Sequence, residues 1–299
     1  MSRILITGAT GRVAGVVARE LASAHDVTAL ARFSDPAAQE RLEAFGVRCV
    51  TADMVGDLSA VPDDAEILLN FAVSFSSDWG AALAVNAEAL GLIVDRLPLL
   101  ERILHCSSMG VYAASSGVHA EDDALGDSNE KMMPTYSISK IAGESMARYL
   151  ARSRGIPTTI ARLASPYGNH GGFPWFMLLS ILQDQPVTLH TSAPCLYNLI
   201  HEDDLMASLP LLLDAADVPA TVLNWGDPVA TSAEDWCEEM ARLVGRKLRI
   251  ERSDMAPPPG RVDVARLTAL GYEPTVDWSV GLRRMIEHLH PDELVSFND

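Results

Sequence analysis

The chain has 299 residues, 48% of them hydrophobic, which is enough for one large α/β core or for a core with a smaller lobe attached. Its formal net charge of −17 argues against a nucleic acid or an anionic membrane as a partner, since both require clustered basic residues. No apolar stretch reaches the roughly 20 residues of a membrane span, and the short apolar start does not resemble a secretion signal.

The cysteines and histidines indicate the compartment and argue against a metal. The four cysteines lie far apart without CxxC spacing, and the eight histidines show no spacing typical of metal ligands. We therefore expect free thiols, a cytoplasmic protein and no metal site.

The first 165 residues alternate short apolar runs with longer segments of helical spacing. The predicted strands are residues 4–7, 27–31, 47–51, 67–71, 103–106 and 158–163. The predicted helices are residues 12–23, 37–44, 81–97 and 136–155. Nearly continuous apolar strands separated by helices predict an α/β fold with a doubly wound, Rossmann-like parallel sheet.

The pattern loosens after Pro166. We expect a loop over residues 168–172, a chain breaker over 256–260, one strand over 222–225 and helices over 175–182, 235–244 and 280–289. The predicted organisation is a dinucleotide-binding domain over residues 1–165, to whose sheet part of 190–230 returns. Residues 166–299 then form mainly a small substrate-binding lobe.

A glycine turn follows the first predicted strand. The run Thr7-Gly8-Ala9-Thr10-Gly11-Arg12-Val13-Ala14 lies between that strand and a helix. Glycines at such a junction let the backbone approach a pyrophosphate, which the amino end of the helix then stabilises. Ala14 stands in place of a third glycine and is small enough for close packing of helix and strand. The turn favours dinucleotide binding, with a tight structural turn as the alternative.

The end of the second predicted strand indicates which dinucleotide is bound. An acidic residue there accepts hydrogen bonds from the ribose 2′-hydroxyl of NAD, whereas an arginine pairs with the 2′-phosphate of NADP. The run Thr28-Ala29-Leu30-Ala31-Arg32-Phe33-Ser34 contains one arginine and no acid. We therefore expect NADP in preference to NAD. The alternative is that Arg32 is an ordinary surface residue.

Tyr136 and Lys140 open a predicted helix and lie four residues apart, so their side chains share a helix face. The pKa of a free tyrosine is about 10, and a nearby cation lowers it. The pair then forms a general acid/base that moves a proton on and off an alcohol oxygen. The alternative is an amphipathic tyrosine beside a solvated lysine, although the chain has only three lysines.

Two hydroxyl groups precede this pair in the sequence. Ser107 and Ser108 follow the apolar run 103–106, at the carboxyl end of a predicted strand and on the sheet edge of the glycine turn. One hydroxyl can hold the substrate's oxygen while Tyr136 handles its proton. The alternative is a pair of turn-forming serines.

Together these residues resemble the extended short-chain dehydrogenase/reductase family, in its epimerase and dehydratase branch, over nearly the whole chain. Many moderate motifs in the right order are jointly specific. The matching segments are residues 7–14, 70–73, 85–88 with Asn86, 107–112, 136–140 followed by 142–144, 162–168, 200–205 and 270–274.

The resemblance implies roles for individual positions. Tyr136 is expected to be the catalytic acid/base, Lys140 its modulator and an anchor of the nicotinamide ribose, and Ser108 the hydroxyl that binds the reacting oxygen. The family also suggests a homodimer built from the helices that contain Asn86 and Tyr136. The full set of predicted cofactor-binding residues, Arg32 included, is Gly8, Thr10, Gly11, Arg12, Val13, Arg32, Asp53, Met54, Phe71, Ala72, Val73, Asn86, Tyr136 and Lys140.

Departures from the family pattern bear on the substrate. Sugar 4,6-dehydratases carry an Asp-Glu pair directly after the catalytic hydroxyl, where this chain has Met109 and Gly110, so dehydration is not expected. Nucleotide-sugar enzymes often carry an asparagine at the position of Ser165 and an arginine at that of Tyr197. Both residues help to hold the nucleotide diphosphate in those relatives. Their loss weakens the nucleotide-sugar interpretation, although Arg261 or another arginine can substitute.

Three functions remain as hypotheses. The first is reversible hydride transfer between NADP(H) and a carbonyl or secondary alcohol of a small polar molecule, sugar-like molecules included. The second is a sugar epimerase that keeps NAD bound, and the third is a regulatory protein that binds a dinucleotide without reacting it. The substrate-binding candidates, each with a structural alternative, are Ser108, Trp79, His170, Trp175 and Arg261.

Overall fold

The computed structural model describes residues 1–295 and places a seven-stranded sheet in the order β12-β7-β5-β4-β1-β2-β3. The neighbouring strands from β3 to β5 pair in parallel. The predicted doubly wound fold is therefore confirmed. The strands of this sheet are β1 (Arg3–Thr7), β2 (Asp26–Ala31), β3 (Arg48–Thr51), β4 (Ile67–Asn70), β5 (Arg102–Ser108), β7 (Thr158–Leu163) and β12 (Thr221–Trp225).

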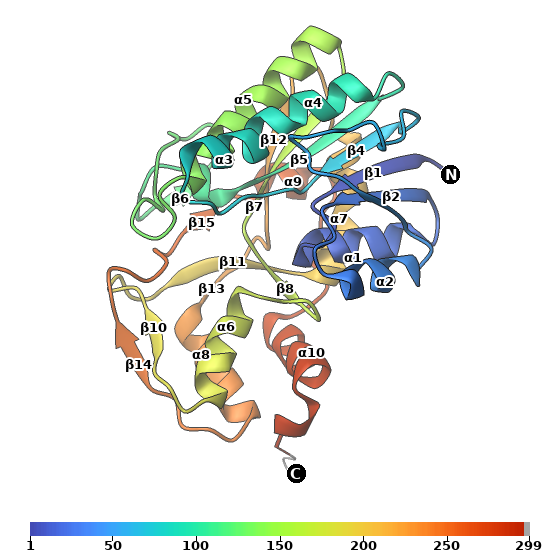
Figure 1. Ribbon diagram of the computed structural model, residues 1–299. Helices are drawn as coiled ribbons and strands as arrows, with labels where there is room; N and C mark the ends of the chain where they lie inside the picture. Colours follow the sequence, from blue (N-terminus) through green and yellow to red (C-terminus); the bar gives the residue numbers. More distant parts are fainter. Residues whose placement is uncertain (296–299) are drawn as a thin grey trace. The chain divides into compact units, whose positions relative to one another are not determined.

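Helices cover both faces of this sheet (Figure 1). On one face lie α1 (Arg12–Leu21), α2 (Pro36–Glu43) and α7 (Glu202–Asp214). On the other lie α3 (Trp79–Leu83), η1 (Ala84–Glu88), α4 (Ala89–Arg96) and α5 (Tyr136–Arg154). The apolar strands bury both faces, as Leu68 and Ile103 of the sheet do by packing with Ile93 of α4 and Leu150 of α5.

The predicted helix over residues 81–97 is not regular. Residues Ala84–Glu88 form a π-helical turn between α3 and α4. Such turns are rare inside α-helices and are frequent at functional sites. Here the turn contains Asn86, whose side-chain contacts are described below.

The chain forms two compact units. The first comprises Met1–Ala113, Ala124–Arg162 and Leu209–Leu223 and holds most of the seven-stranded sheet. The second comprises Ala114–Asp123, Leu163–Ser208 and the described residues from Asn224 onward. Because each unit draws on separate stretches of the chain, neither one is a continuous half of the sequence.

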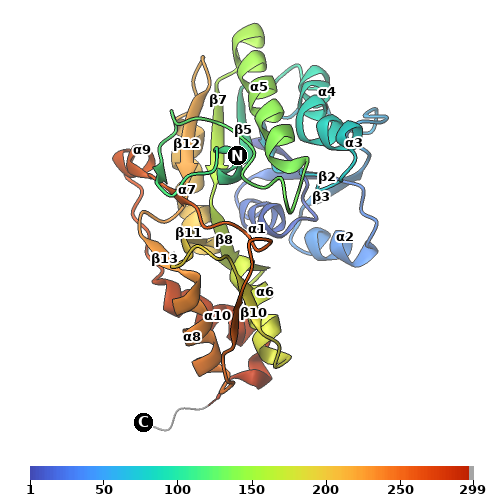
Figure 2. The same cartoon turned by 90° about the vertical axis from the view of Figure 1, so that its left-hand side faces the viewer.

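The second unit contains three small sheets. The largest has the order β13-β11-β8-β9, and the others pair β10 with β14 and β6 with β15. Helix α6 packs against α8, which also contacts α10 (Figure 2). The elements of the second unit are β6 (Val118–His119), β8 (Ser165–Gly168), β9 (Gly171–Gly172), α6 (Phe173–Leu182), β10 (Val187–Leu189), β11 (Leu196–His201), β13 (Ala230–Ser232), α8 (Ala233–Leu243), β14 (Ile250–Arg252), β15 (Arg261–Val262), α9 (Ala265–Ala269), α10 (Trp278–Leu289) and η3 (Pro291–Glu293). The short helix η2 (Met109–Val111) belongs to the first unit.

Residues 168–172 differ from the predicted loop. Strands β8 and β9 form a short antiparallel pair there, in which Tyr167 faces Gly172. Gly172 has a φ of 102°, and a Cβ on it would lie 2.8 Å from the Cα of Tyr167. Glycine is thus required because the two backbones approach closely. A glycine-rich loop and a tight hairpin both need glycine for this reason, so the sequence did not distinguish the predicted loop from the observed hairpin.

Within residues 1–295, no helix is long and apolar enough to cross a membrane. The same residues hold no group of three or more His, Cys, Asp or Glu side chains arranged to bind a metal ion. The four cysteines are free thiols.

Candidate active site

The glycine turn lies at the carboxyl end of β1. Gly8 has a φ of 70°, and a Cβ on it would lie 2.7 Å from the Cα of Ala72, so both conformation and space require glycine. Gly11 is the N-cap of α1, and no side chain of the described residues caps this end of the helix. Because Thr10, Gly11 and Arg12 are exposed and Val13 is half-buried, the first turn of α1 can receive an anion such as a pyrophosphate.

The segment after β4 closes against this turn. The hydroxyl of Thr7 donates a hydrogen bond to Oδ1 of Asn70 at 2.6 Å and accepts one from the amide of Ala72 at 3.2 Å. Phe71 and Ala72 are buried, while Val73 is 40% exposed. The structure therefore brings together the predicted cofactor-binding segments around residues 8–13 and 71–73.

Arg32 directly follows β2, and Asp53 closely follows β3. These two strands are parallel neighbours, so their carboxyl ends lie on one edge of the sheet. Both side chains are exposed, whereas Met54 is buried. The first acid after Arg32 is Asp35, whose carboxylate caps α2. The end of β2 thus presents the exposed cation of Arg32, while the carboxylate of Asp35 is engaged in capping α2.

Ser108 ends β5 and Tyr136 begins α5, and their side chains lie close together: a Cβ on Gly110 would be 3.3 Å from Oγ of Ser108 and 3.3 Å from Cε1 of Tyr136. The oxygen of Ser108 accepts a hydrogen bond from the amide of Gly110 at 3.0 Å. Both residues are half-buried. The two hydroxyl groups predicted to share the reacting oxygen therefore lie together in the first unit.

Burial raises the pKa of Tyr136 to about 12, and the interaction with the hydroxyl of Ser108 opposes this shift without cancelling it. The prediction that the pKa of the tyrosine is lowered is therefore wrong for the net shift in the protein chain by itself, because burial outweighs the effects that lower the pKa. The spacing of the pair indicated a shared helix face but not how far the phenol is withdrawn from water.

Lys140 is buried, with 3% of its surface exposed, and its ammonium donates a hydrogen bond to the carbonyl oxygen of Cys106 at 2.6 Å. Burial lowers the pKa of Lys140, while Cys106 and Glu144 act in the opposite direction. This contact fastens the first turns of α5 to β5, the strand that ends in Ser108.

A buried polar chain links β5 to the glycine turn. The amide of Asn70 lies 2.9 Å from Nδ1 of His105, and Asn70 accepts the hydroxyl of Thr7. Burial lowers the pKa of His105 well below its ordinary value, and the nearby Lys140 acts in the same direction. His105 is therefore neutral, and its Nδ1 accepts the proton of the Asn70 amide.

Asn86 connects three segments. Its Oδ1 accepts a hydrogen bond from the amide of Ser74 at 2.7 Å, and its amide donates to the carbonyl of Ser74 at 2.9 Å and to the hydroxyl of Ser139 at 2.8 Å. A Cβ on Gly143 of α5 would collide with the backbone oxygen of Asn86. The π-turn thus holds the loop after β4 and the helix of Tyr136 in one arrangement.

A buried ion pair between Glu144 and Arg162 contacts the hydroxyl of Ser107. Glu144 accepts hydrogen bonds from the hydroxyl of Ser107 at 2.7 Å and from two nitrogens of Arg162 at 2.8 Å each. Arg162 also donates to the hydroxyl of Tyr112 at 3.0 Å. All four residues lie in the family motifs of the sequence, which indicated no role for Glu144, Arg162 or Tyr112.

The substrate-binding candidates lie on different units. Trp79 begins α3 in the first unit and is 47% exposed. In the second unit, His170 lies 2.8 Å from a carboxylate oxygen of Glu202, Trp175 donates to His290 at 3.1 Å, and Arg261 donates to the carbonyl of Ser116 at 2.9 Å. Each of these three has an interaction within its own unit.

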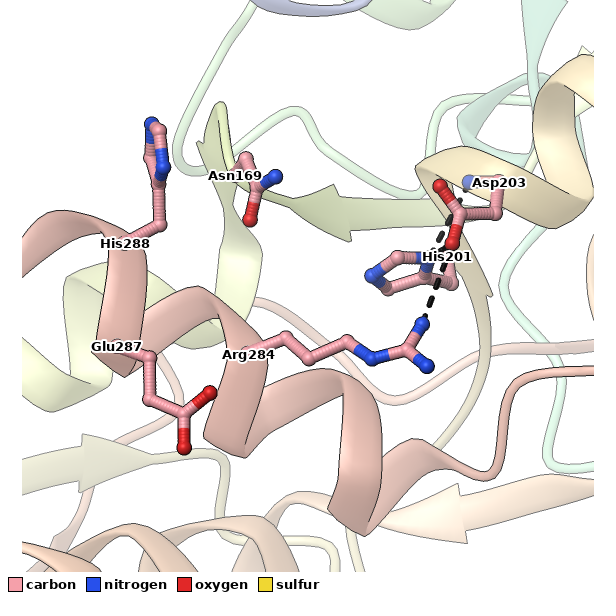
Figure 3. A pocket seen from close by; sticks show the side chains of 6 residues that line it. All are labelled: Asn169, His201, Asp203, Arg284, Glu287 and His288. Atoms are coloured by element: carbon pink, nitrogen blue, oxygen red, sulfur yellow. Dashed lines mark hydrogen bonds and ion pairs between the residues drawn. The ribbon is translucent and has the colours of Figure 1, made fainter.

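An open pocket of about 430 Å³ lies in the second unit (Figure 3). Nδ1 of His201 accepts a hydrogen bond from the amide of Asp203 at 3.2 Å, and Arg284 reaches the same aspartate at 3.3 Å. Nothing in the sequence indicated this pocket, because the residues that line it come from distant parts of the chain. They are Asn169, His201, Asp203, Arg284, Glu287 and His288.

Comparison with known proteins defines the class. Residues 4–226, more than half of the chain, match the NAD dependent epimerase/dehydratase family, and the chain belongs to this family. The predicted resemblance is confirmed. Together with the fold, it defines a NAD-dependent enzyme of the extended short-chain dehydrogenase/reductase type.

Two relatives and two solved structures illustrate the range of this class. The chain is 22% identical to the "Uncharacterized UDP-glucose epimerase YtcB" of Bacillus subtilis (strain 168), over 96% of this chain and 98% of that protein. It is 26% identical to the dTDP-4-dehydro-6-deoxyglucose reductase of Escherichia coli, over 63% of this chain and 61% of that protein.

Among solved structures, UDP-glucuronic acid 4-epimerase from Bacillus cereus in complex with NAD has a TM-score of 0.84 at 20% identity, covering 97% of this chain and 99% of that one. DesIV, a dTDP-glucose 4,6-dehydratase from Streptomyces venezuelae with NAD and TYD bound, has a TM-score of 0.80 at 20% identity, covering 97% of each chain. At these identities the likeness shows the fold alone.

Proposed function

We propose that the protein catalyses reversible hydride transfer between a nicotinamide dinucleotide and a carbonyl or secondary alcohol of a small polar molecule. The observation that carries this proposal is the proximity of the Ser108 and Tyr136 side chains, with Lys140 on the same helix as Tyr136. The glycine turn of the same unit is proposed to receive the pyrophosphate.

Each side chain of this set has one task. A dinucleotide held by the glycine turn would supply the hydride for the carbonyl carbon in the reduction. Tyr136 would give its phenolic proton to the carbonyl oxygen, so that an alcohol and the oxidised dinucleotide would result. The hydroxyl of Ser108 donates a hydrogen bond to the same oxygen as negative charge develops on it. Lys140 supports the phenolate that remains, by its positive charge.

Sugar epimerisation is the second candidate, and the comparisons favour it. The relative from B. subtilis and the structure from B. cereus are both named as epimerases of UDP-sugars. Two features of this chain weigh against a nucleotide sugar. Tyr197 stands where such enzymes often carry an arginine and is a core residue that donates to the carbonyl of Pro257 at 2.9 Å. Ser165 stands where they often carry an asparagine.

A preference for NADP remains part of the proposal. Arg32 is exposed at the end of β2, and the acid closest after it, Asp35, is engaged in capping α2. An arginine so placed can pair with a 2′-phosphate. The similar structures from B. cereus and S. venezuelae contain NAD, which is why the cofactor must be measured for this chain.

The second unit is proposed to bind the rest of the substrate, and α4 and α5 are proposed to form a homodimer interface. Both helices carry exposed large apolar side chains, Leu92 at 45% and Tyr149 at 64%. If these helices form a dimer, Leu92→Glu combined with Tyr149→Lys will convert it to a monomer in sedimentation velocity. An unchanged sedimentation coefficient would remove these helices from the interface.

One measurement separates the two reactions. The purified protein is denatured, and any released nucleotide is identified by mass spectrometry. Stoichiometric NAD favours an epimerase that retains its cofactor and overturns the interpretation of Arg32. A protein that releases no nucleotide, binds NADPH more tightly than NADH and consumes it with a carbonyl compound supports the reductase.

A further inference from the structure

The ring of Phe75 lies almost flat on the ring of Tyr136. The ring centroids are 5.3 Å apart, and the two planes are inclined by 18°. Phe75 is nevertheless 63% exposed. Burial of a phenylalanine side chain is favourable, so its exposure to water is unusual. An exposed aromatic ring in contact with the proposed acid/base is a candidate substrate contact.

The backbone on both sides of Phe75 is fastened to buried groups. Asn86 forms two hydrogen bonds with the backbone of Ser74. The hydroxyl of Thr135, a residue only 2% exposed, donates to the carbonyl of Ser76 at 2.6 Å. Phe75 is thus held between two anchored neighbours, and its position against Tyr136 is built into the fold.

The exposed apolar surface extends along the same segment. Val73 is 40% exposed and Trp79 is 47% exposed, so three large apolar side chains between residues 73 and 79 face solvent. Contiguous exposed apolar side chains mark binding surfaces more often than isolated ones do. In this segment, Phe75 contacts the proposed catalytic Tyr136.

We propose that Phe75 is a specificity-determining residue, which forms an apolar wall beside the reacting carbon. It selects carbonyl compounds and secondary alcohols that carry an alkyl group or a ring C–H face next to that carbon. A substrate that carries hydroxyl groups at this position would leave them without hydrogen-bond partners against the phenyl ring, which is costly. The inference rests on the proposed function and adds to it the chemistry of the substrate next to the carbonyl.

The test compares two ketones that differ in this respect. Cyclohexanone presents C–H groups next to its carbonyl, whereas 1,3-dihydroxyacetone presents hydroxymethyl groups. Binding of each to the enzyme saturated with oxidised dinucleotide is measured by saturation-transfer difference NMR, because a ketone cannot react with the oxidised cofactor. The variants are Phe75→Ser, Phe75→Leu and, as a matched control, Phe45→Ser, which changes another phenylalanine of the first unit that is 55% exposed.

The wild type is expected to bind cyclohexanone more tightly than dihydroxyacetone. Phe75→Ser is expected to weaken cyclohexanone binding about tenfold and dihydroxyacetone binding less than about twofold, with Phe75→Leu between the two proteins for cyclohexanone. Phe45→Ser is expected to match the wild type. Equal affinities of the wild type for the two ketones, no binding of either, or equal losses in Phe75→Ser overturn the proposal.

A failure of the proposal for Phe75 can be distinguished from a failure of the proposed hydride transfer. If Phe75 governs ketone binding as expected but Tyr136→Phe leaves turnover unchanged, the acid/base assignment fails while the apolar wall stands. Dinucleotide affinity, measured by fluorescence titration, is expected to be unchanged in all Phe75 variants, which separates loss of the wall from loss of the cofactor site.

Discussion

Glu144 and Arg162 form a two-pronged ion pair, with Nε donating to Oε1 and Nη2 donating to Oε2, and each residue is only 1% exposed. The two residues lie 18 positions apart in the chain, one on α5 and one on β7. The pair joins the helix that carries Tyr136 and Lys140 to the interior of the sheet. Its loss would therefore affect both stability and the placement of these side chains.

Removing one member of this pair leaves the other charge buried. We expect Arg162→Leu to lower the free energy of unfolding by about 3–5 kcal/mol, and the double variant with Glu144→Gln to lose less than the sum of the two single losses. Urea denaturation measures both effects. The control is Arg154→Gln, which removes an exposed ion pair with Asp95 in the same unit and is expected to cost less than about 1 kcal/mol. Equal losses for Arg162→Leu and the control would contradict the prediction.

Tyr136→Phe removes the proposed proton donor and keeps the ring that contacts Phe75. Hydride transfer is expected to fall by about 10²- to 10⁴-fold, whereas dinucleotide affinity changes little. Pre-steady-state absorbance at the nicotinamide band measures the first quantity, and fluorescence titration the second. Tyr149→Phe, on the exposed part of the same helix, serves as the control. A rate within a few fold of the wild type would assign proton transfer to another group.

The raised pKa of Tyr136 gives the two directions opposite pH profiles. Reduction requires the protonated phenol, so its kcat/KM is expected to stay level from pH 6 to 9 and to fall only as the pH approaches about 12. Oxidation requires the phenolate, so its kcat/KM is expected to rise about tenfold per pH unit below the pKa. Any cation bound beside the phenol lowers the pKa and moves both profiles to lower pH. An oxidation rate independent of pH between 6 and 9 would show that the phenol does not titrate in this step.

Gly8 and Gly46 both have a positive φ, but only Gly8 also lacks space for a side chain, so alanine at each position distinguishes backbone strain from steric collision. Gly8→Ala is expected to abolish dinucleotide binding and to destabilise the fold, because its Cβ would lie 2.7 Å from the backbone of Ala72. Gly46 has a φ of 83° but no atom within 4 Å of an added Cβ, so Gly46→Ala costs only about 1–2 kcal/mol of strain and leaves binding intact. Isothermal titration calorimetry and thermal unfolding measure the pair. Equal binding by both variants would exclude the close approach at Gly8 as the basis of the site.

Most of the sheet could be predicted because its strands are buried on both faces and read as apolar runs. Ser108 and Tyr136 could be predicted to lie together because Ser108 ends a strand and Tyr136 begins a helix, and the hydrophobic pattern of the sequence reveals both elements. Phe75 could not be found in this way, since it lies in a loop whose path depends on hydrogen bonds from Asn86 and Thr135. The pKa of Tyr136 was also out of reach, because burial depends on packing between distant segments rather than on the four-residue spacing to Lys140.

The two anchors around Phe75 impose a rule on how this enzyme can diverge. An insertion or deletion between Ser74 and Ser76 would pull one anchored backbone group away from Asn86 or Thr135, whereas a replacement of the side chain at position 75 would disturb neither. Loop length is therefore constrained while side-chain identity is open. A descendant of this protein can acquire a new substrate by a point change next to Tyr136 and inherit the hydride-transfer apparatus unaltered.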